Sequence, residues 1–342
     1  MLPMKTVLLQ TFVYNHWHIH SYRMSRRICS REQYLLGCRQ RFSLAALYSL
    51  SFHCICQVMS TESQHTLEDS PPLIVMSDLD GTLLDHDTYS FTPAVPVISR
   101  LRTAGIPLML NTSKTAAELR TLRETLNNTD PYVVENGSAI YFPDTAFIKS
   151  IESSAQISGK DVHILGASRA EILSIIQKKR SEENFLFTGF SDMEVSEVIA
   201  YTGLSESEAA QAMTREFSEP LIWQDSAHQL RKFEALIANH GLRLLRGGRF
   251  VHVIGACDKG KCLQWFRECY TRSGKSAPRF VALGDSQNDV AMLNAADIAV
   301  IVRSSHHEPP DLEKQSSVII TEEFGPQGWA HALTQILDET LT

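Results

Sequence analysis

Strands and helices alternate between residues 73 and 136, and this alternation constrains the fold more than any other feature of the chain. LIVMSD at 73–78 is a short apolar run that ends in a polar turn, as expected of a strand buried on both faces. Similar runs occupy 107–112 and 132–136, and helix signals stand between the runs: Thr92-Pro93, with a helix to about Ala104, and a capping box from Thr115 to Glu118. This order predicts a parallel sheet with right-handed crossovers.

The rhythm changes between residues 145 and 254, which divides the parallel pattern into two parts. Capping boxes begin at Ser168 and Ser205, and strand-like runs occur near 185–188, 220–224, 242–246 and 249–254. The parallel pattern resumes with a helix from Lys259 and strands at 280–285 and 298–302. We therefore predict an α/β protein with a Rossmann-like core formed by residues 71–144 and 255–342, and an inserted α+β cap domain of residues 145–254.

Composition restricts the class of protein and of partner. The chain has 342 residues, of which 43% are hydrophobic and 21% charged, so it can bury a sizeable core and form two domains. The net charge of −7 gives no overall positive field, and no long basic run follows the first sixty residues. We expect no nucleic-acid partner.

The first sixty residues differ from the rest in charge. They hold seven Lys or Arg and one acid, Glu32, for a net charge of +6. Three interpretations compete: an organelle transit peptide, a membrane segment at Phe42–Cys56, and a true start at Met59. The apolar run is interrupted and too short to span a bilayer, so no stable membrane association is expected. We interpret residues 1–70 as an N-terminal extension that is disordered or precedes the real start, and residues 1–58 as dispensable.

The cysteines indicate the redox environment. Four of the seven lie in the first sixty residues, and the last three, Cys257, Cys262 and Cys269, cluster around one predicted helix without metal-ligand spacing. The spacings fit neither a disulfide framework nor a zinc site, so we expect reduced thiols and a cytoplasmic protein.

Acidic residues follow two buried strands and suggest a metal site. Asp78 and Asp80 come directly after the first strand, and Asp285 and Asp289 follow the strand at 280–285. Carboxyl ends of parallel strands meet at one edge of a sheet, where α/β folds bind ligands. Although D-x-D-G is also a common turn, the second acidic pair at the same edge favours a Mg²⁺ site.

A phosphate could approach these acids only if cations or hydrogen-bond donors were also present. Lys259 begins a predicted helix and can supply a positive charge, although most single lysines are solvated surface residues. Thr112 ends the second strand and can offer its hydroxyl and its backbone N–H to a phosphate oxygen, or can simply cap the next helix. The pattern as a whole favours a phosphate-handling site.

Four ordered motifs resemble those of the haloacid dehalogenase superfamily over residues 73 to about 335: DLDGT, a strand-end Thr, a helix start with Lys-Gly, and GDxxND. The resemblance implies that Asp78 is the nucleophile, that Asp80 is the general acid and base, and that Thr112 and Lys259 hold the phosphoryl group. The insert lies between the second and third motifs, as in members with a large α/β cap.

The same resemblance implies a magnesium-dependent phosphatase with an aspartyl-phosphate intermediate. Asp285 would complete the metal site with Asp78 and the backbone carbonyl of Asp80, and Asp289 would support that site from the second shell. A non-catalytic binding module that keeps the fold is the alternative from another class. The cap would close over the substrate, with hinges near Phe142–Ala146 and Gly255–Asp258.

A closer resemblance is to the mannosyl-3-phosphoglycerate phosphatases. It rests on five segments: SDLDGTLLD (77–85), NTSKT (111–115), VVENGSAIY (133–141), GGRFVHV (247–253) and TEEFGPQGW (321–329). The family implies hydrolysis of 2-O-mannosyl-3-phosphoglycerate to inorganic phosphate and the compatible solute mannosylglycerate, in mannosylglycerate biosynthesis. A phosphatase for another sugar phosphate is the nearest alternative. Expected substrate-binding residues are Ser113, Lys114, Arg249, His252 and Asn288, with Arg249 and His252 candidates for the glycerate carboxylate.

Overall fold

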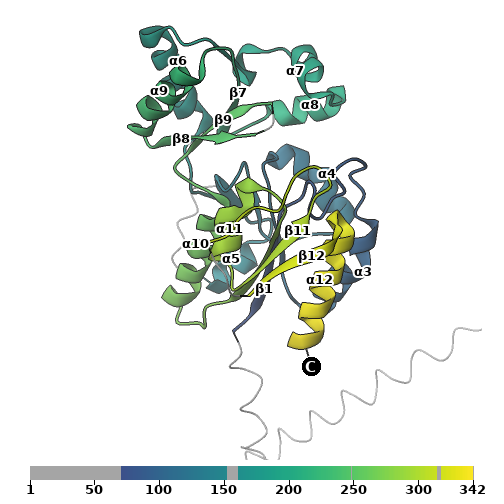
Figure 1. Ribbon diagram of the computed structural model, residues 1–342. Helices are drawn as coiled ribbons and strands as arrows, with labels where there is room; N and C mark the ends of the chain where they lie inside the picture. Colours follow the sequence, from purple (N-terminus) through teal and green to yellow (C-terminus); the bar gives the residue numbers. More distant parts are fainter. Residues whose placement is uncertain (1–70, 152–160, 248, 314–316, 342) are drawn as a thin grey trace, which may run out of the picture. The chain divides into compact units, whose positions relative to one another are not determined.

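The larger sheet runs through the centre of a three-layer structure. The computed structural model of the protein describes residues 71–151, 161–247, 249–313 and 317–341. Within them, eight strands lie in the spatial order β12-β11-β10-β1-β2-β3-β4-β5 (Figure 1). The pairings from β12 to β3 are parallel, and β4 and β5 add two antiparallel pairings. The bounds are β1 Leu73–Ser77, β2 Leu108–Asn111, β3 Tyr132–Val134, β4 Ala139–Tyr141, β5 Val162–Ile164, β10 Arg279–Gly284, β11 Ile298–Arg303 and β12 Val318–Phe324.

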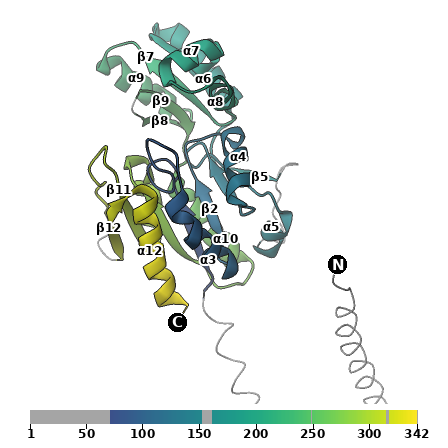
Figure 2. The ribbon, with the colours of Figure 1, turned by 90° about the vertical axis from the view of Figure 1, so that its right-hand side faces the viewer.

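Helices cover both faces of this sheet because its strands are apolar on both sides. Val75 packs into one hydrophobic cluster, whereas its neighbours Ile74 and Met76 pack into another, as strand alternation requires. The first cluster includes α3 (Val95–Thr103), α4 (Ala116–Leu126) and α12 (Gly325–Thr340); the second includes α5 (Thr145–Ile151), α10 (Lys259–Arg272) and α11 (Val290–Ala295) (Figure 2). Short 3₁₀ helices span η1 (Thr92–Ala94) and η3 (Gln287–Asp289).

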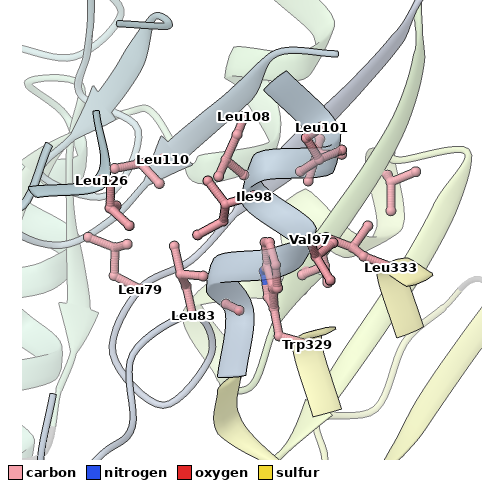
Figure 3. Close-up of a cluster of buried hydrophobic side chains, with 14 of the residues drawn as sticks. Leu79, Leu83, Val97, Ile98, Leu101, Leu108, Leu110, Leu126, Trp329 and Leu333 are labelled. Atoms are coloured by element: carbon pink, nitrogen blue, oxygen red, sulfur yellow. The ribbon is translucent and has the colours of Figure 1, made fainter. Parts of the chain in front are cut away.

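Trp329 is the largest side chain at the centre of the first cluster. Figure 3 shows it between residues of α3 and the segment that follows β1, with Leu79, Leu83 and Val97 around it. Its indole Nε1 donates a hydrogen bond of 2.9 Å to Ser77 Oγ, and Ser77 Oγ donates one of 2.6 Å to the carbonyl of Asp78. The C-terminal helix therefore fixes the end of β1, where the first acid of the candidate site follows.

The smaller sheet belongs to the inserted segment. Its four described strands lie in the order β6-β7-β9-β8 and pair antiparallel. Their bounds are β6 Phe187–Gly189, β7 Ser218–Trp223, β8 Leu242–Arg246 and β9 Val251–Gly255. The helices α6 (Arg169–Glu183) and α9 (Ala227–Ala238) share a hydrophobic cluster with this sheet, and η2 (Phe190–Asp192), α7 (Val195–Thr202) and α8 (Glu206–Met213) form a second, smaller one.

The boundary expected at residue 145 requires a correction. β5 pairs with β4 in the larger sheet, and Phe142 and Ile148 pack against α10, so the described residues 142–151 and 161–164 belong with the core. The chain leaves the core at Leu165–Ser168 instead of Phe142–Ala146, and it returns through Gly255–Asp258, between β9 and α10. The hinge motion predicted there stays a prediction. These two passages lie against each other, since a Cβ on Gly255 would come 2.4 Å from the backbone N of Ala167. The signal was hard to see because β4 and β5 are only three residues long.

The predicted fold class is confirmed: a parallel central sheet accompanies a separate antiparallel cap sheet. The capping boxes expected at Thr115, Ser168 and Ser205 all form, and α10 begins at Lys259. Among the described residues, no helix has the length and apolar character needed to cross a membrane. The predictions for residues 1–70, including Phe42–Cys56 and Met59, fall outside the described residues.

Candidate active site

Three adjacent strands bring the predicted site residues to one edge of the larger sheet. β1 pairs with β2 on one side and with β10 on the other. Asp78 and Asp80 follow β1, Thr112 follows β2, and Asp285 follows β10. The chain passes from β1 to β2 on one side and from β10 to β11 on the other, so the strand order reverses between β1 and β10. Such a reversal is a topological switch point, where α/β folds bind ligands.

Asp78 and Lys259 form a buried ion pair at the centre of this edge. Lys259 Nζ lies 2.6 Å from Asp78 Oδ1 and 2.6 Å from Asp289 Oδ1, and its side chain is fully buried. Burial alone would lower the pKa of Lys259, but Asp289 and Asp78 outweigh it and raise that pKa above its usual value. The lysine therefore stays charged and offsets the charge of two carboxylates.

The Lys-Gly sequence has a packing reason. Asp258 caps α10 by accepting hydrogen bonds from the backbone N–H groups of Gly260 and Lys261, which starts the helix at Lys259. A Cβ on Gly260 would lie 2.4 Å from the carbonyl oxygen of Ala291. Only glycine permits this approach of α10 to α11, and the approach carries Lys259 to the acids.

Asp289 uses both carboxylate oxygens within the protein. Its Oδ1 accepts from Lys259, and its Oδ2 accepts from the backbone N–H groups of Asp285 and Ser286 at 3.1 and 3.0 Å. Its side chain also fills the space beside Gly284, where a Cβ would lie 2.5 Å from Asp289 Cβ. Asp289 therefore shapes the loop after β10, and its support of a metal site stays a prediction.

Asp285 is held from two other segments. Thr82 Oγ1 donates to its Oδ1 at 3.1 Å, and His307 Nε2 lies 3.0 Å from its Oδ2. Gly81, with φ of +80°, lets the DLDGT turn approach closely, since a Cβ there would lie 2.6 Å from Asp285 Oδ2. Glycine at position 81 therefore allows the two acidic loops to approach each other.

The three buried acids fit a hard divalent cation. Carboxylate oxygens of Asp78, Asp285 and Asp289 lie within 4.8 Å of one another. The pKa of Asp78 is raised well above its usual range, first by burial and then by Asp289, although Lys259 opposes the shift. Burial and Asp289 also raise the pKa of Asp285. A dication bound by Asp78 and Asp285 would relieve that repulsion, and Mg²⁺ prefers such oxygen donors.

Asp80 points one oxygen at a protein cation and leaves the other without a partner. Its Oδ2 lies 3.0 Å from Lys114 Nζ, and its Oδ1 is buried with no hydrogen bond to the described protein. Burial would lower the pKa of Lys114, but Asp80 reverses the effect and raises it, so the lysine remains charged. The unpartnered oxygen is free to interact with a bound molecule, because a buried polar atom without a partner is costly.

Thr112 differs in one respect from expectation. Its backbone N–H donates to the carbonyl of Val133 at 3.2 Å, so the predicted use of this N–H for phosphate is wrong. The hydroxyl Oγ1 accepts from the backbone N–H of Lys114 at 3.2 Å and can still donate its proton. The preceding Asn111 donates to the carbonyl of Lys259 at 3.0 Å, and this buried strand-end amide was not anticipated as a positioning residue.

A cavity of about 290 Å³ adjoins these residues and contains three of the predicted substrate-binding positions, Ser113, His252 and Asn288. Asn288 Nδ2 donates to Asn136 Oδ1 at 3.2 Å, which closes part of its wall. In β9, Val251 and Val253 pack on the cap helices, so the intervening His252 faces the opposite side. A larger hollow of about 690 Å³ runs along α4, and its lining includes none of Asp78, Asp80, Asp285 and Asp289.

Arg249 is not among the residues that line this cavity. It is exposed and donates a hydrogen bond to the carbonyl of Tyr201 in α7, whereas Arg246, at the end of β8, lines the cavity. His252 Nδ1 is buried and unpartnered, and burial, followed by Arg215, lowers the pKa of His252 to about 3. The imidazole is therefore neutral at physiological pH. The sequence predicted that Arg249 would accompany His252. The pairing of β8 with β9 instead brings Arg246 to the cavity that His252 lines.

Glu135 anchors the cap strand β7 to the core. It follows β3, has a positive φ of 49°, and accepts hydrogen bonds from the backbone N–H groups of Glu216 and Phe217 at 2.9 and 3.1 Å and from Ser218 Oγ at 2.5 Å. Arg215 lies 3.9 Å from the same carboxylate and donates to the carbonyl of Ser113 at 3.3 Å. The sequence did not lead us to this anchor. The available signal was Glu135 itself, a charged residue between a buried strand and an Asn-Gly turn.

Comparison with known proteins identifies the family. A family model described as haloacid dehalogenase-like hydrolase matches residues 75–322. A solved superfamily phosphatase from Bacteroides thetaiotaomicron is similar, with a TM-score of 0.54 and 19% identity over 80% of this chain and 98% of that one. A haloacid dehalogenase-like hydrolase from the same organism has a TM-score of 0.53 and 16% identity over 78% and 100% of the two chains.

A sucrose-phosphatase from Synechocystis, solved with sucrose and phosphate, has a TM-score of 0.51 and 14% identity over 78% of this chain and 98% of that chain. These identities are low, so the solved structures support the fold alone. The family model spans more than half of the sequence and includes the motifs at the carboxyl ends of β1 and β10. This chain therefore belongs to the haloacid dehalogenase-like hydrolases.

Proposed function

We propose that this protein is a magnesium-dependent phosphomonoesterase that forms an aspartyl phosphate on Asp78. One observation carries the proposal: a buried carboxylate held by Lys259 at 2.6 Å stands beside a second acid, Asp80, that has an unpartnered oxygen. The first arrangement suits a nucleophile whose charge is compensated, and the second suits an acid and base that meets its partner only when substrate is bound.

The two acids divide the reaction between them. A carboxylate oxygen of Asp78 attacks phosphorus while the bond from phosphorus to the leaving oxygen breaks, and Asp80 gives that oxygen a proton. Water then attacks the phosphorus, Asp80 takes the proton from water, and the bond from phosphorus to Asp78 breaks. Both side chains return to their starting states, and inorganic phosphate is released.

Other residues would hold the transferred group in place. The buried ammonium of Lys259 and the hydroxyl of Thr112 would contact phosphoryl oxygens. Such contacts matter because phosphoryl transfer depends mainly on positioning and charge stabilisation. Asp78, Asp285 and the backbone carbonyl of Asp80 would hold Mg²⁺. Bound there, Mg²⁺ would reduce the repulsion between the nucleophile and the phosphate.

The proposed substrate is 2-O-mannosyl-3-phosphoglycerate, hydrolysed to mannosylglycerate. Motif similarity to the mannosyl-3-phosphoglycerate phosphatases supports it, as does a cavity that combines Arg246 with the neutral His252 beside the proposed phosphate site. A guanidinium recognises a carboxylate, and an imidazole with an unpartnered nitrogen recognises a hydroxyl. Another phosphorylated sugar would use the same catalytic residues with different cap contacts.

Release of inorganic phosphate from a panel of compounds tests the proposal. The panel contains 2-O-mannosyl-3-phosphoglycerate, its glucosyl analogue, sucrose 6-phosphate, mannose 6-phosphate and p-nitrophenyl phosphate, each with Mg²⁺ and with a chelator. We expect Mg²⁺-dependent release with the highest kcat/KM for the mannosyl compound. A higher value for another sugar phosphate would overturn the substrate assignment only. Absence of release from every compound would overturn the phosphatase assignment and favour the non-catalytic alternative.

A further inference from the structure

A second group of metal-type ligands lies outside the buried acids. His86 and Asp87 belong to the loop that follows the DLDGT turn, and His306 belongs to the loop after β11. Potential ligand atoms of the three residues lie within 4.8 Å of one another, and all three side chains are exposed. We propose that His86, Asp87 and His306 form a separate binding site for a transition-metal dication of the Zn²⁺ type.

The ligand chemistry distinguishes this group from the buried acids. Two imidazoles with one carboxylate are typical ligands of Zn²⁺ and its neighbours, whereas Mg²⁺ prefers an all-oxygen set such as Asp78 and Asp285. The ring centroids of His86 and His306 are 3.9 Å apart, and His306 Nε2 lies 3.5 Å from Asp87 Oδ1. Exposure leaves the remaining coordination positions to water. The three side chains are thus close enough to share one ion.

The loop that supplies two of the ligands is ordered by its own hydrogen bonds. Asp85 Oδ1 accepts from the backbone N–H of Thr88 at 2.9 Å and from Thr88 Oγ1 at 2.6 Å. The backbone N–H of Asp85 donates to the carbonyl of Ser90, and that of Tyr89 donates to the carbonyl of Asp85. His86 and Asp87 therefore sit at the tip of a closed turn, which lowers the entropy lost when they bind an ion.

The third ligand connects this group to the candidate active site. His306 directly precedes His307, whose Nε2 lies 3.0 Å from Asp285 Oδ2. On the other loop, the ring centroid of Tyr89 lies 5.3 Å from Nζ of Lys114, the partner of Asp80. An ion held by His86, Asp87 and His306 would therefore tie together the two loops that border the buried acids.

Isothermal titration with Zn²⁺ tests the site by a readout that is independent of turnover. The full-length protein is freed of metals by a chelator, dialysed, and titrated in a large excess of Mg²⁺, which occupies the all-oxygen site. We expect one Zn²⁺ site in the unaltered protein. His86→Ala, Asp87→Ala and His306→Ala should each weaken Zn²⁺ binding at least about 10-fold, because each removes a ligand.

Two controls make the titration decisive. His331→Ala removes another exposed histidine beside a carboxylate, Glu323 at 3.1 Å, and should leave Zn²⁺ binding unchanged because this pair has no third ligand within the described residues. Asp285→Asn should also keep the Zn²⁺ site. Zn²⁺ binding that is lost in Asp285→Asn but kept in His306→Ala would place the ion among the aspartates and overturn the proposal. Absence of any Zn²⁺ site in the unaltered protein would overturn it as well.

Discussion

At the scale of single residues, two buried polar atoms lack protein partners, one in the proposed catalytic part of the site and one in the proposed selective part. Asp80 Oδ1 lies beside the proposed phosphate position, and His252 Nδ1 belongs to a residue that lines the adjoining cavity. Both atoms carry the cost of burial in the absence of a ligand, and a substrate that bonds to them would recover it. Asp80 Oδ1 is therefore expected to bond to the reacting group, and His252 Nδ1 to discriminate among ligands by hydrogen bonding.

The low pKa of His252 predicts a pH dependence of stability. Its folded value of about 3 is below the ordinary value of 6.5, so between these limits the unfolded chain binds a proton that the folded protein does not. The histidine thus destabilises the fold increasingly as pH falls below about 6.5. In thermal unfolding between about pH 7 and pH 4, His252→Gln should lose stability less steeply than the unaltered protein.

A matched control for this prediction is His228→Gln, which alters an exposed histidine of the same cap. Its unfolding temperature should follow that of the unaltered protein across the whole pH range. Parallel curves for all three proteins would mean that His252 keeps an ordinary pKa and is more accessible to water than its contacts indicate.

At the scale of elements, the junction between the end of β3 and the start of β7 joins the two sheets. Glu135 accepts hydrogen bonds from Glu216, Phe217 and Ser218 at the start of β7. Arg215, which precedes them, donates a hydrogen bond to the core carbonyl of Ser113. Ser113 directly follows Thr112, so the same junction contacts the proposed phosphate-binding segment. The anchor therefore links cap position to the catalytic edge.

Replacement of Glu135 by glutamine should weaken this junction without changing its size. One carboxylate oxygen becomes an NH₂ group, which turns a donor toward N–H or O–H partners and leaves at least one of them unpaired. We expect a loss of about 1–3 kcal/mol in the free energy of unfolding, measured with urea. Glu216→Gln is the control, because Glu216 is exposed and its amide can still accept from Tyr141; its effect should stay within about 0.5 kcal/mol. Equal effects of the two changes would contradict the anchor.

At the scale of the whole molecule, the proposed function divides between core and cap: the core would supply the chemistry and the cap would select the substrate. The buried acids, Lys259 and Thr112 all belong to the core, whereas Arg246 and His252 reach the cavity from the cap strands β8 and β9. A change in the cap should therefore alter the choice of substrate and leave the reaction at phosphorus intact.

Arg246→Ala and Arg249→Ala test this division. Arg246 lines the cavity and Arg249 is engaged with Tyr201, so only Arg246→Ala should lower kcat/KM for a carboxylate-bearing sugar phosphate, by on the order of 10-fold or more. Hydrolysis of p-nitrophenyl phosphate, which has no carboxylate, should change little in either variant. A selective loss in Arg249→Ala alone would restore the original interpretation that Arg249 binds the glycerate.

The sequence predicted the parts of the molecule that depend on local chemistry. Capping boxes such as Thr115 with Glu118, and apolar strands that end in acids, carry their own signals, so the core elements and Asp78, Asp80 and Asp285 could be placed from the pattern. Contacts between distant segments could not. The pairing of β5 with β4, the anchor at Glu135, and the turn that directs Arg249 to α7 all depend on tertiary packing.

The most direct test of the central claim is the mass of the peptide that contains Asp78 after acid quench. Asp80→Asn should slow hydrolysis of an aspartyl phosphate because no base activates water, while p-nitrophenyl phosphate, a good leaving group, still phosphorylates the enzyme. With Mg²⁺ and this substrate, we expect the Asp78 peptide of Asp80→Asn to gain the mass of one phosphoryl group. A variant that also carries Asp78→Asn should show no gain, with an unchanged unfolding temperature. Phosphorylation at another residue, or turnover by folded Asp78→Asn protein, would contradict the assignment of Asp78 as the nucleophile.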